Sequence, residues 1–188
     1  MKISINVRVK YSVEHLLAMI LCLRRQTYEN WEAVIVTDGP NKPAKDLIYQ
    51  LKDPRLIFIE TPTPLGFWGH PYRDLGISYC TGDWIGLTND DNYYVPGYLK
   101  KMTDAIKSSP KIKMVMCDML HKEFQWMMCM CEPIITRCDL GNWLVRAEIA
   151  KSTPWPGNDV ADDGRYVEQI AAKADGVYMI HIPLFIKN

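Results

Sequence analysis

Short runs of β-branched and apolar residues alternate along this chain with longer stretches of helical periodicity, and this alternation constrains the fold more than any other feature. The apolar runs predict strands at residues 3–9, 31–37, 55–60, 83–88, 113–117 and 177–182. The periodic stretches predict helices at residues 12–25, 43–52, 72–80, 96–108 and 162–174. Such an order indicates βαβ crossovers. We therefore expect an α/β fold with a mixed, mostly parallel sheet flanked by helices, and short antiparallel strands within residues 118–145.

Length and composition fit one globular domain. The chain has 188 residues, of which 48% are hydrophobic and 23% charged, and this composition excludes an intrinsically disordered chain. Lys and Arg together number 22, as do Asp and Glu, so the chain lacks the basic surplus of a protein that binds nucleic acid. No internal repeat interrupts it, and we expect a single domain over residues 1–188.

The apolar segments are too short to predict a membrane anchor. The longest of them, residues 16–23, cannot cross a bilayer. Residues 1–11 alternate between apolar and polar positions, which is typical of a strand rather than of a signal peptide. We expect a cytoplasmic enzyme, or one that contacts a membrane only peripherally, with no transmembrane segment.

The six cysteines are scattered, and most stand in apolar runs. Without a secretory signal we expect them to be reduced thiols. The alternative is a zinc site made by His121, Cys129, Cys131 and Cys138. Paired zinc-binding cysteines usually have two to four residues between them, and Cys129 and Cys131 are separated by one, which argues against it.

Two polar clusters follow predicted buried strands, namely Asp38 and the run at residues 89–92. In α/β sheets ligands bind at the carboxyl ends of strands, which is where both clusters are expected. Asp90 and Asp91 repel each other, and a divalent ion such as Mg²⁺ or Mn²⁺ would favour holding both carboxylates there. The alternative is a solvated turn or helix cap, because Asn and Asp also favour those positions.

Four segments resemble, in order and spacing, the family-2 glycosyltransferases of the GT-A fold. They are RQTYENWE at residues 25–32, VIVTDG at 34–39, YRDLG at 72–76, and GDWIGLTNDD at 82–91 followed by Pro96. The last resembles the segment that carries the family's D-x-D metal-binding motif. The resemblance implies a GT-A type, Rossmann-like fold.

The resemblance also implies two halves within the one domain. About residues 1–92 would bind a nucleotide sugar, and about 93–188 would face the acceptor. Residues 139–146 are similar to the family's acceptor-side segment, where Gly141 would allow close backbone approach. Apolar side chains upstream could line an acceptor groove or instead belong to the core or to a homo-oligomer surface; they are Trp126, Met127, Met128 and Met130.

Donor-binding roles follow from the resemblance. Asp38 would accept a hydrogen bond from the base, most often the uracil of a UDP-sugar, and Arg73 would reach the base or a phosphate. Asp90 would contact the ribose or the donor sugar, and Asp91 would bind the metal that bridges the diphosphate. The run at residues 90–92 most resembles the variant found in spore-coat polysaccharide glycosyltransferases. The alternatives are a turn residue for Asp38 and a solvated helix charge for Arg73.

The implied metal is Mn²⁺ or Mg²⁺, and the sequence departs from the family pattern near it. Thr37 and Asn89 stand where the family has carboxylates. Some GT-A enzymes take a late histidine as a further metal ligand, which here would be His181. The alternative is a strand histidine with an ordinary hydrogen bond.

The catalytic base implied by the resemblance is Asp163, with Asp162 in reserve. Both stand at the start of a predicted helix, where the family has a catalytic carboxylate. An inverting transfer needs a base within reach of the acceptor hydroxyl. The alternative is that these residues cap the helix and complement its dipole.

Together these features predict a metal-dependent inverting glycosyltransferase of glycan or polysaccharide synthesis. It would move a sugar from a nucleotide-sugar donor, with UDP as the expected nucleotide, to a hydroxyl of a saccharide or lipid-linked saccharide. A nucleotidyltransferase is one alternative, but residues 8–15 lack the glycines of a phosphate loop. The other is a nucleotide-sugar-binding protein without activity, since the chain is short for the family and fold alone does not imply activity.

Overall fold

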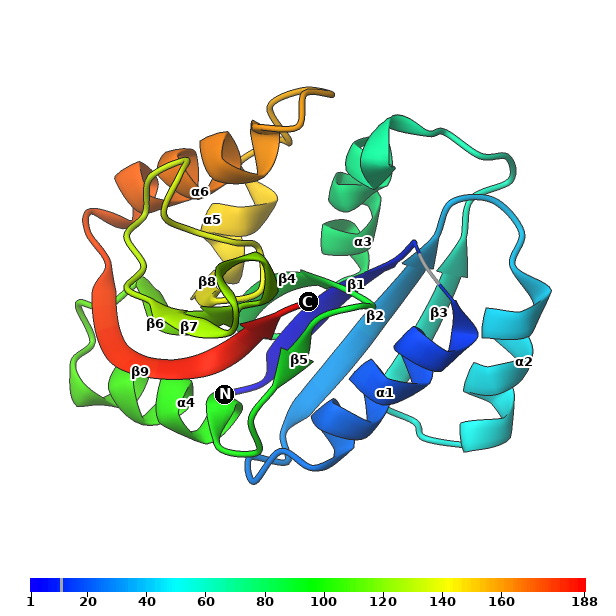
Figure 1. Ribbon diagram of the computed structural model, residues 1–188, viewed down its shortest axis with the longest axis horizontal. Coiled ribbons are helices and arrows are strands. Elements are labelled where there is room, and N and C mark those ends of the chain that lie inside the picture. The colour runs from blue at the N-terminus through cyan, green and yellow to red at the C-terminus, as the bar shows by residue number, and fades with distance from the viewer. Residues whose placement is uncertain (11) are drawn as a thin grey trace.

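A mixed sheet of nine strands forms the centre of the computed structural model, which describes residues 1–10 and 12–188 (Figure 1). The strands are β1 (Ile3–Val9), β2 (Trp31–Thr37), β3 (Leu56–Glu60), β4 (Trp84–Asn89), β5 (Tyr93–Tyr94), β6 (Met114–His121), β7 (Met127–Cys129), β8 (Trp143–Arg146) and β9 (Tyr178–Lys187). Their order is β3-β2-β1-β4-β8-β6-β9-β5, and β7 pairs with β6. The first four are parallel; β8 runs antiparallel to both neighbours, and β9 runs parallel to β6. The expected mixed α/β sheet is confirmed.

Helices cover both faces of this sheet. They are α1 (Val13–Arg24), α2 (Lys42–Leu51), α3 (Arg73–Tyr79), α4 (Tyr98–Ser108), α5 (Ala147–Lys151), α6 (Asp162–Ala174) and the 3₁₀ helices η1 (Phe67–Tyr72) and η2 (Lys122–Phe124). In Figure 1, α1, α2 and α4 lie on one side of the sheet, and α3, α5 and α6 lie on the other. In the described residues, none of the helices combines the length and the apolar character needed to span a bilayer.

The central strand β1 is buried on both faces because helices pack against each of them. Its polar residues therefore need partners inside the protein. Ser4 Oγ donates to Glu32 Oε1 at 2.6 Å. Asn6 Nδ2 donates to the backbone carbonyl of Arg73 at 3.1 Å, which attaches α3 to the sheet. The third polar residue, Arg8, stands near the carboxyl end of the strand, where the site described below opens.

The region between residues 118 and 145 contains short antiparallel strands, as the sequence predicts. β6 extends past the predicted end and pairs with both β7 and β8. The strand β5 and the helix α5 were not predicted, because two and five residues are too few to show a period. β9 continues beyond the predicted end at residue 182, and Pro183 is accommodated where the pairing of β9 with β6 shifts register.

All six cysteines are free thiols, in agreement with the sequence. Within residues 1–10 and 12–188, no group of three or more His, Cys, Asp or Glu side chains is arranged to hold a metal ion. The zinc alternative involving Cys129, Cys131 and Cys138 is therefore not supported.

Gly141 offers a test of packing between the turn before β8 and the strand β9. A Cβ atom at Gly141 would lie 2.0 Å from the Phe185 ring, which is fully buried. Gly141→Ala should lower the free energy of unfolding by about 1–3 kcal/mol, the usual cost of overpacking. Gly97→Ala is the matched control, because nothing lies within 4 Å of a Cβ at that position. Urea denaturation of both variants measures the difference, and equal losses would contradict this account.

Candidate active site

A cavity of about 380 Å³ opens at the carboxyl ends of the central strands β1 and β4. The residues that line it are Arg8, Lys10, His70, Asn89, Asp91, Glu123, Val160, Asp163, Lys187 and Asn188. They come from both halves of the chain. The cavity thus brings the predicted metal ligand, Asp91, together with the predicted base, Asp163, at the edge of the sheet where ligands of α/β folds bind.

Asp91 carries an oxygen suited to bind a ligand. Its Oδ1 is buried and has no hydrogen-bond partner. Burial raises the pKa of Asp91, while the positive charges of Lys187 and Arg8 oppose that shift. Mg²⁺ and Mn²⁺ often bind through one or two carboxylates together with substrate phosphates, and Asp91 fits the protein side of such a site.

Asp90 and Asp38 use their carboxylates to hold backbone segments at this edge. Asp90 is fully buried, and its Oδ1 accepts a hydrogen bond from the Lys10 N–H at 3.1 Å. Asp38 follows β2 and accepts hydrogen bonds from the N–H groups of Leu65 and Gly66 at 2.5 and 3.0 Å. The turn-stabilising alternative thus describes what Asp38 does in this structure, and the remaining lone pairs of the Asp38 carboxylate can accept further hydrogen bonds.

Arg73 lies beneath the site rather than in it. It is 1% exposed, so the alternative of a solvated helix charge is wrong. Its guanidinium donates to the Thr88 carbonyl at 3.2 Å and to Asn89 Oδ1 at 2.8 Å. Burial lowers the pKa of Arg73 to about 10, and the carboxylate of Asp163 opposes that shift. Arg73 therefore supports the end of β4 and places a positive charge near Asp163.

Asp163 has one buried carboxylate oxygen, although its side chain as a whole is 35% exposed. Its Oδ1 is buried without a hydrogen-bond partner, 3.9 Å from His70 Nδ1. Burial raises the pKa of Asp163, and the positive charge of Arg73 reduces the shift. A carboxylate with a raised pKa is a better proton acceptor near neutral pH than an ordinary one.

His70, which the sequence analysis did not select, forms part of the same wall. It is 3% exposed and stacks on Trp155, with ring centroids 5.1 Å apart. Trp155 in turn stacks on Tyr166 at 4.9 Å. Burial lowers the pKa of His70, while the charge of Asp163 opposes this. A histidine in a Gly/Pro-rich loop just before Arg73 was the available signal.

Asp162 has a different role from its neighbour. Its Oδ2 accepts the Asp159 N–H and its Oδ1 accepts Arg165 Nη1, both at 2.7 Å. Burial alone would raise its pKa, but these hydrogen bonds lower it overall. Asp162 does not line the cavity among the described residues, and its contacts match the structural role that the sequence left open for this pair.

His181 and Lys187 both lie on β9 but reach different places. His181 Nδ1 lies 3.4 Å from Asp118 Oδ2, and in the described part of the chain His181 is not among the residues that line the cavity. Lys187 does line it, with its Nζ 2.6 Å from Asp139 Oδ2. Arg8 and Lys187 were missed because a charged residue in a strand gives no sign of which cavity it will enter.

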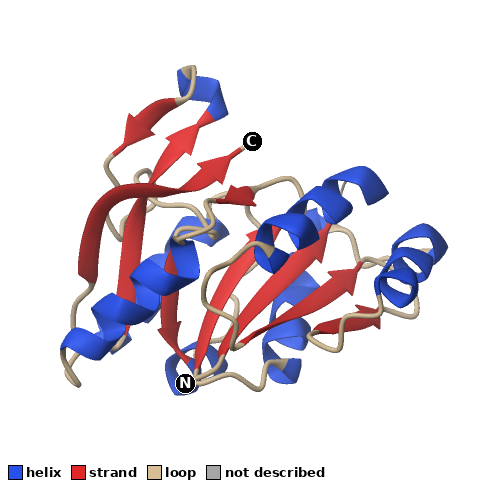
Figure 2. Cartoon of the chain, turned by 90° about the horizontal axis from the view of Figure 1, so that it is seen from below, coloured by secondary structure: helices blue, strands red, loops and turns tan. Residues whose placement is uncertain are grey.

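The end of β6, η2 and β7 form a hairpin that extends from the body of the sheet (Figure 2). Large apolar side chains on or just beyond it are 48–63% exposed, namely Phe124, Trp126, Met127, Met128 and Met130. The alternative that Trp126 and these methionines belong to the core is therefore wrong. An acceptor groove and a homo-oligomer surface both remain predictions.

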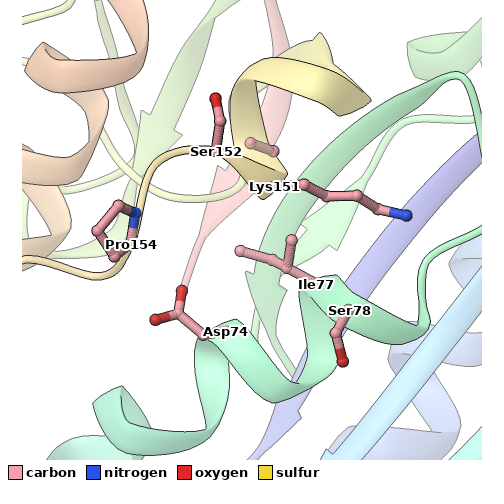
Figure 3. Close-up of a pocket in the computed structure, with 7 residues that line it drawn as sticks. Asp74, Ile77, Ser78, Lys151, Ser152 and Pro154 are labelled. Carbon is pink, nitrogen blue, oxygen red and sulfur yellow. The ribbon is translucent and has the colours of Figure 1, made fainter.

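A second cavity, of about 430 Å³, lies between α3 and α5 (Figure 3). Its polar side chains are engaged with the protein. Lys151 runs away from Asp74 in Figure 3 and donates to the Cys80 carbonyl at 2.8 Å. Both carboxylate oxygens of Asp74 accept the Trp155 N–H at 3.1 Å. Asp91 and Asp163 are not among the described residues that line this second cavity. It instead adjoins Trp155, the residue that stacks on His70.

Neutralising Asp162 and neutralising Asp163 should change the free energy of unfolding in opposite directions. Because the folded-state pKa of Asp163 is raised, its ionisation destabilises the protein as the pH rises above its ordinary pKa. Asp163→Asn should therefore raise the free energy of unfolding at pH 7, and the gain should shrink on acidification toward pH of about 4. Asp162→Asn should lower stability at pH 7, because the pKa of Asp162 is depressed. Urea denaturation of both variants between pH 4 and 8 tests this prediction. If both substitutions stabilised the protein at pH 7, or both destabilised it, the different roles given to the two carboxylates would be contradicted.

Comparisons with known proteins identify the family and the fold of the chain. Residues 8–123 match the profile described as Glycosyl transferase family 2. The chain is 30% identical over 112 residues to "Uncharacterized glycosyltransferase YwdF" of Bacillus subtilis, covering 58% of this chain. It is 29% identical over 105 residues to "Uncharacterized glycosyltransferase MJ1057" of Methanocaldococcus jannaschii, covering 54% of it. The matches span 40% and 36% of those two relatives.

Solved structures show the same fold at low sequence identity. S. aureus TarS 1–349 in complex with UDP-GlcNAc superposes with a TM-score of 0.86 at 16% identity, over 99% of this chain and 58% of TarS. The mannosyltransferase PcManGT from Pyrobaculum calidifontis, in complex with GDP-Man and Mn²⁺, gives 0.79 at 14% identity, over 99% of this chain and 56% of its own. With the profile match over more than half of its length, the chain belongs to glycosyl transferase family 2.

Proposed function

We propose that this chain transfers a sugar from a nucleotide-sugar donor, with UDP as the nucleotide, to a hydroxyl acceptor with inversion at the anomeric carbon. One observation carries the proposal. Asp91 and Asp163 line one cavity, and each has a buried carboxylate oxygen with no hydrogen-bond partner. Such oxygens are costly to bury unless a ligand completes their bonding.

On the donor side, the nucleotide would lie along the carboxyl ends of β2 and β4. Asp38 would accept a hydrogen bond from the uracil, and Asp90 would accept one from the ribose or the donor sugar. Arg73 would contribute through its hydrogen bond to Asn89, since direct contact with a phosphate requires its buried guanidinium to move. TarS with UDP-GlcNAc and PcManGT with GDP-Man support a nucleoside diphosphate sugar as the donor class.

Asp91 would hold Mn²⁺ or Mg²⁺, and the PcManGT complex with Mn²⁺ supports this choice. The ion would neutralise negative charge on the departing diphosphate. Phosphate oxygens of the donor and water would supply the other ligands, because the described residues form no cluster of three metal-binding side chains. His181 is left out of this site, since it lies against Asp118.

Asp163 would act as the base. Its Oδ1 would take the proton of the acceptor hydroxyl as the oxygen attacks the anomeric carbon on the face opposite the diphosphate. The raised pKa of Asp163 favours proton uptake, while the buried charge of Arg73 favours the ionised form that a base needs beforehand. Glu123, in the same cavity wall, leads into the exposed apolar hairpin. We propose that the acceptor, a saccharide or lipid-linked saccharide, approaches from that side.

The metal role is tested by the effect of Mn²⁺ on UDP affinity. Mn²⁺ should tighten UDP binding by about tenfold or more in the wild type, a difference of roughly 1.4 kcal/mol. Asp91→Ala should abolish that gain and leave the fold intact. Asp104→Ala is the control, because Asp104 is an exposed carboxylate paired with Lys100 on α4. Calorimetric titration in Mn²⁺ and in EDTA supplies the affinities, and equal values in the wild type would contradict metal dependence.

The catalytic role is tested by Asp163→Asn, which preserves size but cannot accept a proton. Donor affinity should persist, and transfer should fall by about 10²–10⁴, the usual contribution of a positioned base. Product release is followed in both proteins with a panel of sugar acceptors at matched donor saturation. Unchanged turnover would remove Asp163 as the base and leave Asp162. Donor binding without turnover in either protein, across the panel, would favour a nucleotide-sugar-binding protein.

A further inference from the structure

Three basic residues, Arg8, Lys10 and Lys187, line the same cavity as Asp91. Two of them come from opposite ends of the chain, Arg8 near the end of β1 and Lys187 at the end of β9. Neither belongs to the segments that carry the family resemblance. We propose that Arg8 and Lys187 form a binding site for a diphosphate group that works without a metal ion. The proposal rests on the proposed function only in taking the ligand to be a nucleoside diphosphate.

Arg8 is a buried cation without a matching anion. Arg8 is only 5% exposed, and its Nε is buried without a hydrogen-bond partner. Over the described residues, no carboxylate oxygen lies within 4.0 Å of its guanidinium. A buried guanidinium is costly unless it is paired, so this arrangement indicates an anionic ligand.

The backbone gives Arg8 little choice of position. It pairs with Val36 of β2 on one side and with Asn89 of β4 on the other. Its carbonyl accepts the Asp90 N–H at 3.0 Å. With the strand held on both edges, the guanidinium stays beside the acidic run. Its planar fork of N–H donors matches the oxygens of a phosphate group.

Lys187 supplies the second charge. Its Nζ is 2.6 Å from Asp139 Oδ2, which uses one of the three N–H donors of the ammonium. Burial lowers the pKa of Lys187, but the charges of Asp139, Asp91 and Asp163 raise it overall, so Lys187 stays charged at neutral pH. Lys187 and Arg8 both oppose the rise in the pKa of Asp91, which locates both cations near that carboxylate.

A diphosphate fits this pair better than a single carboxylate does. It carries several negative charges spread over two phosphoryl groups, so it can contact both cations at once. Without Arg8 and Lys187, an anion in the cavity would be repelled by the nearby carboxylates. These belong to Asp91, Asp139, Asp163 and Glu123. Binding therefore depends on both cations, and it does not depend on which base or sugar the diphosphate carries.

The test uses inorganic pyrophosphate in EDTA, measured by calorimetric titration at low ionic strength. The wild type should bind it with one site per chain. Arg8→Gln and Lys187→Met should each weaken binding by about tenfold or more, since each removes charge-assisted hydrogen bonds to the phosphate oxygens. Arg8→Lys should restore part of the loss, because lysine keeps the charge but lacks the fork. Arg25→Gln, which removes an exposed arginine at the end of α1, should bind as the wild type does.

Thermal melting of the same variants keeps the result interpretable. Arg8→Gln removes a buried charge without a partner, so its melting temperature without ligand should equal or exceed that of the wild type. No pyrophosphate binding in EDTA by the folded wild type would overturn the proposal, and so would wild-type affinity in both Arg8→Gln and Lys187→Met. Sugar transfer does not enter this test. Pyrophosphate binding with no transfer would refute only the proposed function, and transfer with no metal-free binding would refute only this site.

Discussion

The hydrogen bond from Asn6 to the backbone of Arg73 is the contact on which the arrangement of the active site depends. It joins the middle of β1 to the start of α3 at 3.1 Å. Gly76 makes the approach possible, because a Cβ there would lie 2.3 Å from Asn6 Nδ2. With α3 held in this position, Arg73 reaches Asn89 at the end of β4, and His70 lies against Asp163. One polar residue in the middle of a strand thus aligns a helix, a strand end and a loop.

The site itself is a balance of buried charges drawn from both halves of the chain. Asp91 and Asp163 each have a raised pKa because burial disfavours their ionised forms. Arg73, Arg8 and Lys187 offset part of that penalty from three different elements. Such a site contributes little to stability. Clusters of buried charges of this kind are typical of positions where a ligand binds or a reaction takes place.

The sequence predicted the long elements well and the short ones poorly. The boundaries of α6 match the prediction because thirteen residues show a clear helical period. The strand β5 and the helix α5 are set by tertiary pairing and leave no period to read. In the site, Asp91 and Asp163 could be selected because they follow recognisable motifs. His70, Arg8 and Lys187 could not, because their significance comes only from what the fold places opposite them.

The irregular pairing of β9 with β6 has a consequence for how this chain can change. Between Cys117 and Met119 the strand β6 advances by two residues, while β9 advances by five from Ile180 to Phe185. β9 thus uses an odd number of residues more than β6 over this stretch. Parity matters because successive side chains on a strand point to opposite faces. A deletion of one residue in this stretch of β9 would exchange inner and outer faces for everything that follows. Phe185 would then point away from the core, and Lys187 would point away from the cavity. The number of residues in β9 therefore affects both the packing of the core and the charges of the active site.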